Sequence, residues 1–272
     1  MPLEDHIGDI CRKARLQTKT GLNDAAQAAG VKTEELQQWE SNGVIGCPVD
    51  IHALSVLLGL DSSKAVAVSQ GWEPQKLDLS QWQNLSMLTT SEGFDVNSFV
   101  AWDPDSKEAA IFDTGWFAES IFALADSEGL NMQHLFITHM HGDHVAALAQ
   151  IRKRWPTIMV YSNNDAAPEK NRVREGESVK LGCMEVRARF TPGHAVDGVT
   201  YVVDLWRGSA PPVAMVGDAI FAGSMGKDFS TPELAQIKVQ EQILSLPGDA
   251  LICPGHGPVT TVSQELEHNP FF

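Results

Sequence analysis

The sequence predicts a mixed α/β domain preceded by a small all-α domain. The first 72 residues show the apolar spacing and the alanine-rich stretches that are typical of short helices. From about residue 84, apolar runs of strand length alternate with helical segments. Several of these runs end in glycine-containing turns that carry a histidine or an aspartate. We therefore expect an all-α domain at 1–72, a linker at 73–83 and an α/β domain at 84–272.

Composition and charge disfavour several classes of protein. A chain of 272 residues is long enough to bury a core in both a large and a small domain. The net charge of -15 and the isoelectric point near 4.9 disfavour broad contact with nucleic acid or anionic membrane, because both surfaces repel an acidic protein. The four cysteines include no C-x-x-C pair, which fits a reducing cytoplasm. We see neither a signal peptide nor a membrane-spanning stretch, so we expect a cytoplasmic protein without a membrane partner.

The N-terminal region predicts a succession of short helices. Gly30 ends an alanine-rich helix, and Thr33 can cap the helix that follows. Two short helices with a glycine-containing turn between them form the helix-turn-helix pattern. The expected helices run through residues 7–14, 25–29, 33–40, 49–60 and 63–70.

This pattern resembles a known DNA-binding family. Ala25-Ala26, Ala29-Gly30-Val31 and Leu36-x-x-Trp39-Glu40 resemble the Cro/repressor-type helix-turn-helix domain over roughly the first seventy residues. The resemblance implies operator binding through the helix at about 33–40. The charges disagree, because that helix carries three glutamates and no arginine, and residues 1–72 hold six basic against nine acidic residues. We therefore expect a module for packing or homodimer formation, and we do not expect nucleic acid as a partner.

The α/β region predicts strands with helices interspersed. The turn Asp103-Pro104-Asp105-Ser106 connects the second and third expected strands as a hairpin. The expected strands cover residues 85–90, 97–102, 109–112, 135–137, 157–161, 179–191, 213–216 and 250–253. The expected helices cover residues 116–125 and 145–154.

The segment Thr138-His139-Met140-His141-Gly142-Asp143-His144 is the strongest functional signal. Three imidazoles and a carboxylate fall within six positions, at the end of a strand and the start of a helix. On a continuing strand His139 and His141 point to the same side, whereas Asp143 and His144 project from the turn and first helical turn. The segment holds three of the nine histidines, so we interpret it as half of a metal site rather than as a His-rich polar loop.

Three later fragments each place one ligand-capable side chain after a short strand. They contribute His194 after Thr191-Pro192-Gly193, Asp218 after Gly217, and His256 within Pro254-Gly255-His256-Gly257-Pro258. A single histidine at such a position is usually an ordinary polar residue. The order and types of all seven groups together indicate a metal centre.

These seven groups carry a second resemblance, which covers the chain from about residue 76 onward. With Asp113-Thr114-Gly115 upstream, they are similar to the metallo-β-lactamase-fold hydrolases, and the 217–224, 254–258 and 269–272 segments resemble glyoxalase II-like proteins. The resemblance implies an αββα sandwich with two metals at one sheet edge. It assigns the first metal to His139, His141 and His194, and the second to Asp143, His144 and His256, with Asp218 as the bridge.

The ligand chemistry favours hydrolysis. Five imidazoles and two carboxylates without a thiolate suit zinc, iron or manganese, of which we expect zinc. Two metals about 3.5 Å apart lower the pKa of a shared water toward ~7, so that hydroxide can attack a carbonyl. A thiol, with a pKa of roughly 8.5, leaves without much protonation, so we expect a thioester or similar small acyl substrate. Asp143 is the group that can serve as base or proton shuttle, and Asp218 is the other carboxylate at the reaction centre.

The sequence departs from the glyoxalase II pattern in two ways, and two alternative functions stay open. Relatives commonly have an arginine where this chain has Lys227, which can contact substrate as a point charge but not as a bidentate fork. Only two tyrosines are present, which puts glutathione recognition in doubt. One alternative is a persulfide dioxygenase with a single iron on His139, His194 and Asp218. The other is a transcriptional regulator whose metal domain senses a ligand.

Overall fold

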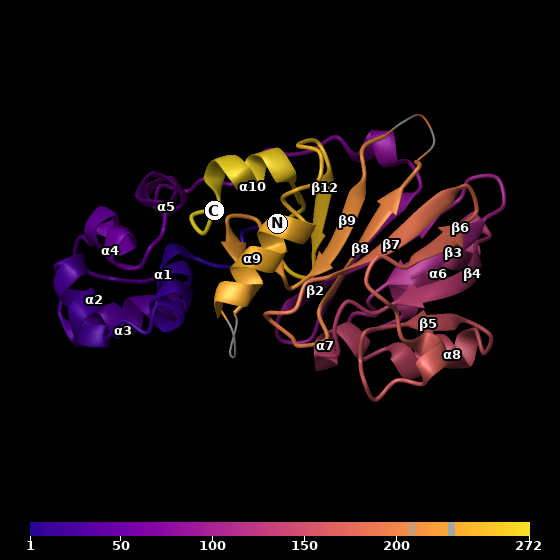
Figure 1. Cartoon of the computed structure of the whole chain (residues 1–272), viewed down its shortest axis with the longest axis horizontal. Coiled ribbons are helices and arrows are strands. Elements are labelled where there is room, and N and C mark those ends of the chain that lie inside the picture. Colours follow the sequence, from indigo (N-terminus) through magenta and orange to yellow (C-terminus); the bar gives the residue numbers. More distant parts are fainter. Residues whose placement is uncertain (207, 209, 228–231) are drawn as a thin grey trace.

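Two β-sheets packed face to face form the larger part of the structure, and helices cover their outer faces (Figure 1). The computed structural model describes residues 1–206, 208, 210–227 and 232–272. The first sheet has the order β1-β2-β3-β4-β5 and the second has the order β13-β12-β9-β8-β7-β6. The first sheet contains β1 (Leu85–Ser91), β2 (Asp95–Trp102), β3 (Glu108–Phe112), β4 (Asn131–Phe136) and β5 (Met159–Tyr161). The mixed α/β fold class predicted from the sequence is confirmed.

The second sheet and the remaining elements follow along the chain. The second sheet contains β6 (Ser178–Leu181), β7 (Met184–Phe190), β8 (Val199–Asp204), β9 (Val213–Gly217), β12 (Leu251–Pro254) and β13 (Thr260–Thr261). A separate hairpin pairs β10 (Ile220–Phe221) with β11 (Ser224–Met225). The helices of this part are α6 (Glu119–Glu128), α7 (Gly142–Val145), α8 (Leu148–Arg154), α9 (Pro232–Gln242) and α10 (Val262–His268), with short 3-10 turns at Leu79–Trp82 and Glu169–Asn171.

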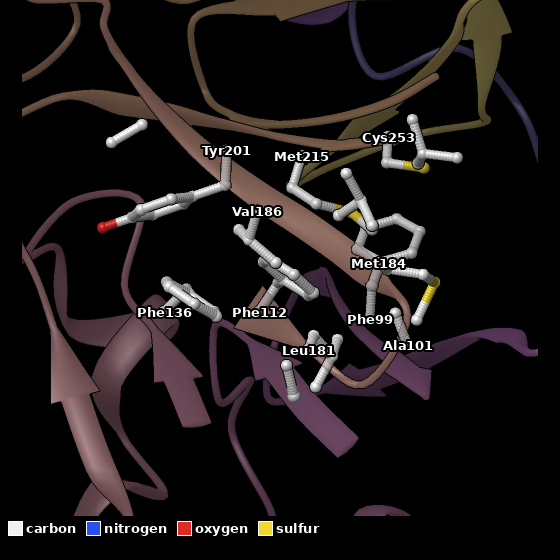
Figure 2. Packing of buried hydrophobic residues seen from close by; sticks show 14 of the residues in the cluster. Phe99, Ala101, Phe112, Phe136, Leu181, Met184, Val186, Tyr201, Met215 and Cys253 are labelled. Carbon is white, nitrogen blue, oxygen red and sulfur yellow. The ribbon is translucent and has the colours of Figure 1, made fainter. Parts of the chain in front are cut away.

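The inner faces of the two sheets meet in an apolar core (Figure 2). Phe112 and Phe136 stack with their ring centroids 5.1 Å apart, and Phe136 lies 4.9 Å from the ring of Tyr201 on the opposite sheet. Alternate residues of β2 point the other way, so Val100 and Trp102 pack in the layer that contains α6 and α8. Both faces of β2 are buried, and its second half, Phe99 to Trp102, is a continuous apolar run in the sequence.

Three expected elements have different boundaries in the structure. The helix expected at 145–154 is divided into α7 and α8, because the Ala147 N–H donates to Thr114 Oγ1 and to the Gly115 carbonyl. The strand expected at 179–191 is a hairpin of β6 and β7. It turns at Gly182, whose φ of 58° favours glycine and where a Cβ would lie 2.3 Å from Asp103 Cβ. The helix expected at 116–125 begins only at Glu119, and β8 was missing from the expectation.

Five helices form the N-terminal region, at positions close to those predicted. They are α1 (Ile7–Gln17), α2 (Leu22–Ala29), α3 (Thr33–Asn42), α4 (Ile51–Leu57) and α5 (Ser62–Ser69). Thr33 is the first residue of α3 rather than its cap, and the Glu35 carboxylate accepts a hydrogen bond from the Lys32 N–H instead. The ends of α2 and α3 are set by Gly30 and Gly43, which both have left-handed φ values.

The helical region packs directly against the α/β part. Its core contains Ile10 and Leu36, and the same apolar cluster includes Met225, Ala235 and Phe271 from the α/β part. Polar contacts also join the two parts, since the Asp61 N–H donates to the Pro270 carbonyl over 2.8 Å. The helices therefore do not form a detached unit.

A buried carboxylate joins α10 to the β10–β11 hairpin. Glu265 is fully buried and accepts hydrogen bonds from the Gly223 N–H, Thr260 Oγ1 and Asn269 Nδ2 at 3.0, 2.7 and 2.8 Å. Burial raises the pKa of Glu265 to about 7, although these hydrogen bonds oppose the rise. The folded protein therefore keeps a proton on Glu265 at pH values where the unfolded chain has lost it.

This carboxylate makes stability depend on pH. The stabilisation is fully present below about pH 4.5 and is lost as the pH rises through about 7. We expect the unfolding free energy of the wild type, relative to Glu265→Gln, to fall by about 3 kcal/mol between these limits. Chemical denaturation at a series of pH values measures this difference. Glu267→Gln, on the exposed side of α10, is the control, and parallel curves for the wild type and Glu265→Gln would contradict the assignment.

Candidate metal centre

The seven side chains predicted as ligands meet at one edge of the sandwich. The loop after β4 carries four of them, and the segments after β7, β9 and β12 carry one each. Strands β9 and β12 are parallel, and β7 runs in the same direction because β8 is antiparallel to both β7 and β9. The Val199 N–H donates to the Thr138 carbonyl over 2.8 Å and joins the two sheets at this edge. The folding of both sheets thus brings distant residues together.

The first group of ligand atoms belongs to His139, His141 and His194. His141 Nδ1 lies 3.0 Å from His139 Nε2 and 2.9 Å from His194 Nε2. His139 is buried, His194 is partly buried and His141 is exposed, so the group is reached by solvent from one side. These are the three residues that the resemblance assigned to the first metal.

The second group belongs to Asp143, His144 and His256. Asp143 Oδ2 lies 3.4 Å from His144 Nε2 and 3.3 Å from His256 Nε2. The carboxylate of Asp218 lies between the two groups: its oxygens are 3.4 Å from His194 Nε2, 3.3 Å from His144 Nε2 and 3.3 Å from His256 Nε2. Asp218 thus has the position expected of a bridging ligand.

The donor set fits divalent metal ions. Tetrahedral ligands at the usual zinc distance of about 2.0–2.1 Å lie about 3.3 Å from one another, which is close to the separations within both groups. Two buried atoms, His144 Nε2 and Asp218 Oδ1, have no hydrogen-bond partner among the described residues. A buried polar atom without a partner is costly, and a bound cation between these two atoms removes that cost.

The buried carboxylate of Asp218 also favours positive charge in the site. Burial alone would raise the pKa of Asp218, but His144 and His256 lower it well below its usual range. Burial lowers the pKa of His256, yet the hydrogen bonds to Asp143 and Asp218 raise it to about 10. Without a metal, protons on these imidazoles balance the carboxylates. A metal ion bound by His144 and His256 would therefore have to displace these protons.

Protein oxygens fix the orientation of most of the imidazoles. The Nδ1 atoms of His144, His194 and His256 are 2.8, 3.1 and 2.6 Å from Asp113 Oδ2, the Lys227 carbonyl and the Asp95 carbonyl. Each of these contacts leaves Nε2 to face the cluster, as second-sphere partners do in metal sites. His141 is the exception, because its Nδ1 is the atom that faces the other ligands.

Asp113 belongs to the candidate site, although no role was predicted for it from its sequence context. Its carboxylate accepts hydrogen bonds from the Thr138 N–H, Thr138 Oγ1 and His144 Nδ1 at 2.8, 2.7 and 2.8 Å. It follows β3, which is parallel to β4, so it reaches the same sheet edge as the histidine-rich loop. The sequence did offer a signal for this role, because both strands end in polar motifs and parallel neighbours deliver such motifs to the same sheet edge. Asp113 therefore positions His144 and the start of the ligand loop.

The N-terminal helices contact the segment that leads to Lys227. Asp5 accepts a hydrogen bond from Ser224 Oγ over 2.5 Å, and Lys13 Nζ donates to the Met225 carbonyl over 2.9 Å and pairs with Asp5. Two residues later, the Lys227 carbonyl accepts from His194. Glu4 lies against Gly257, where an added Cβ would be 3.1 Å from the Glu4 nitrogen. Sequence motifs could not show these contacts, because they join residues more than 200 positions apart.

Comparison with known proteins identifies the family. Residues 92–268 match the model of the metallo-beta-lactamase superfamily. The chain is 29% identical over 203 residues to the hydroxyacylglutathione hydrolase GloC of Haemophilus influenzae, and the match covers 65% of this chain and 93% of that protein. It is 30% identical over 171 residues to the hydroxyacylglutathione hydrolase of Xanthomonas euvesicatoria pv. vesicatoria, covering 62% of this chain but only 64% of that protein.

Solved structures give the same result for the fold. ETHE1 from Myxococcus xanthus superposes with a TM-score of 0.58 at 25% identity, over 68% of this chain and 83% of that one. No helix formed by the described residues has the length and apolarity needed to cross a bilayer. Because the family model covers well over half of the sequence and all seven residues of the candidate metal centre lie within it, the chain belongs to the metallo-beta-lactamase superfamily.

Proposed function

We propose that the chain is a dinuclear metal-dependent hydrolase that cleaves a thioester or a related small acyl compound. The observation that carries this proposal is the position of Asp218 between two groups of three ligands. When bound, two divalent ions, with zinc expected before iron or manganese, supply an activated water and polarise the scissile carbonyl. The similarity to hydroxyacylglutathione hydrolases supports the hydrolytic class.

The chain's own residues divide the work between them. We assign His139, His141 and His194 to one ion, Asp143, His144 and His256 to the other, and Asp218 to both. Burial would raise the pKa of Asp143, but its hydrogen bond with His256 and the nearby His144 lower it. Its carboxylate is therefore ionised and can accept a proton from an attacking water or pass one to the leaving group.

The rim of the metal centre suits an acyl group better than a highly charged one. Phe94, Met140 and Val196 expose 51, 40 and 82% of their surface, respectively. The ring of Phe94 is 5.8 Å from that of His256, Met140 separates two ligands, and Val196 follows His194 by two residues. Exposed apolar side chains that gather around a polar centre are typical of a ligand-binding rim. We also propose that Lys227 contacts the substrate, because its carbonyl is bonded to His194.

A persulfide dioxygenase is the second candidate, and the structural likeness to ETHE1 favours it. It would use one iron on His139, His194 and Asp218, of which the last two lie 3.4 Å apart. The close approach of Asp143 to His144 and His256 favours the two-metal hydrolase, because a single-metal site has no need of a second set of ligands.

We propose that the region 1–72 acts as a packing or dimerisation module rather than as a DNA-binding domain, with 73–83 as its linker to the catalytic domain at 84–272. Glu40 forms a bidentate pair with Arg15 at 2.7 Å, and Glu34 and Glu35 occupy the first turn of α3. Glu34 and Glu35 oppose contact with phosphates, whereas Glu40 is buried and its charge is balanced by Arg15. Salt-sensitive binding of duplex DNA by micromolar protein would contradict this part of the proposal and favour a regulator.

Metal removal tests the proposed hydrolase. We expect the purified protein to hold close to two metal ions per chain, and we expect a chelator to abolish thioester cleavage until zinc is restored, because the water must be activated. Metal analysis and thiol release measure the two quantities. The proposal would be contradicted if the protein held fewer than one metal ion per chain and still cleaved the thioester after chelation.

Oxygen consumption separates the two candidate reactions. We expect the iron-loaded protein to consume no oxygen with glutathione persulfide, while the zinc-loaded protein releases thiol from a small thioester. The physical reason is that hydrolysis needs no open site for oxygen at the metal. Oxygen uptake that depends on both iron and persulfide would instead establish the dioxygenase.

Asp113→Asn tests the orientation of His144. An amide in this place cannot accept all three hydrogen bonds, so we expect the affinity of the second metal to fall by about 10- to 100-fold. Competitive titration with a chromophoric chelator measures both sites. Asp126→Asn, an exposed aspartate paired with Arg154, is the matched control. Unchanged affinity in a folded Asp113→Asn protein would show that this carboxylate does not support the metal.

A further inference from the structure

A cavity of about 510 Å³ lies next to the ligand loop, on the side of α8 and β5. Its wall includes Met140, whose neighbours in the chain are His139 and His141. Consecutive Cα atoms are about 3.8 Å apart, so the cavity begins one residue from two of the proposed ligands. Its volume lies within the range of sites that bind small molecules. None of the seven candidate ligands lines this cavity.

The outer wall of the cavity is an ordered loop. Residues 162–172 form a closed turn, in which the Ser162 and Val173 N–H groups bond to the carbonyls of Asn171 and Ser162 over 2.9 Å each. Asn171 Nδ2 donates to the Val160 carbonyl, and Arg172 Nε donates to the Ala167 carbonyl over 2.7 Å. These bonds pin the loop to β5 and to itself.

The same loop is connected to the metal centre. Asn164 lines the cavity, and its Nδ2 donates over 3.2 Å to Asp197, three residues after the ligand His194. The cavity wall therefore reaches the segments that carry ligands on both sides, the β4 loop and the segment after β7.

The lining is mostly apolar and carries two positive charges. Ile158, Met159 and Val160 belong to the strand side, and Arg152 and Lys170 are the ionisable residues among the lining groups that the structure describes. Neither cation forms a side-chain hydrogen bond or ion pair with any residue in the described part of the chain. In a protein with a net charge of -15, two such cations on one apolar cavity favour an anionic group at its mouth.

We propose that this cavity binds an apolar arm of the substrate that ends in an anion, such as a carboxylate. This inference rests on the proposed function, since it places the scissile carbonyl at the metal centre and the arm beside Met140. Arg152 and Lys170 then select anion-ended substrates, and the apolar wall takes up the methylene chain. Either the acyl group or the thiol of a thioester can carry that arm, and the experiment separates the two.

Three thioesters provide the test. Adipoyl-N-acetylcysteamine carries the anion on the acyl side, 6-methylheptanoyl-N-acetylcysteamine is its neutral counterpart of the same shape, and the acetyl thioester of 6-mercaptohexanoate carries the anion on the thiol side. The proteins are the zinc-loaded wild type, Arg152→Gln and Lys170→Gln. Lys153→Gln is the matched control, because Lys153 follows Arg152 on α8 but lines a different surface with Phe122.

We expect Arg152→Gln and Lys170→Gln each to raise KM for one of the two anion-ended thioesters by about fivefold, the size of one weakly screened ion pair. Their kcat and their KM for the neutral thioester are expected to stay unchanged, and Lys153→Gln should match the wild type throughout. Whichever anion-ended substrate responds identifies the half of the thioester that enters the cavity. Equal KM values for all four proteins on both anionic substrates would overturn the proposal.

A second measurement does not depend on turnover. Adipate is titrated into metal-free protein with ¹³C-labelled methionine methyl groups, of which Met159 lines the cavity and Met215 lies in the inner core. We expect adipate to shift the Met159 signal and not that of Met215, with about fivefold weaker binding in Arg152→Gln. Shifts without thioester cleavage would leave the cavity assigned while the proposed function fails. If adipate left the Met159 signal unchanged, the proposal that this cavity binds an anion-ended arm would be rejected.

Discussion

The candidate metal centre is built around one buried negative charge that hydrogen bonds within the protein do not fully satisfy. Asp218 is 7% exposed, and its Oδ1 has no hydrogen-bond partner among the described residues. An uncompensated buried carboxylate costs several kcal/mol, so groups that carry or bind positive charge must surround it. His144, His194 and His256 approach it to within 3.4 Å from three separate segments of the chain. The convergence of both sheets at this edge is what makes that compensation possible.

The same constraint explains which parts of the site could be predicted. Each ligand follows a short apolar strand and stands in or beside a turn that contains glycine, so the local sequence revealed both its type and its place at a strand end. Local sequence could not reveal that Nδ1 of His141 faces the other candidate ligands, nor that Asp113 accepts a hydrogen bond from His144, because both depend on how strands from distant parts of the chain align. The cavity lined by Arg152 and Lys170 was missed for the same reason.

For the fold, too, some features could be predicted from the sequence and others could not. Apolar spacing placed all five N-terminal helices and most of the strands, because periodicity reports which residues are buried. It does not report what they are buried against. Met225, Ala235 and Phe271 share one apolar cluster with the N-terminal helices, which no pattern in either segment indicated. The break between α7 and α8 likewise follows from a hydrogen bond between Ala147 and Thr114, which lies on a different strand end.

The contact of Asp5 and Lys13 with Ser224 and Met225 connects two events: the docking of the N-terminal helices and the binding of metal at the candidate site. The segment they hold continues to the carbonyl that orients His194. Linkage between such events is reciprocal: if docking of the N-terminal helices improves the geometry of the ligands, metal loading must stabilise that docking by the same free energy. Under the same condition, a change that separates the N-terminal helices from Ser224 and Met225 would weaken metal binding at the candidate site.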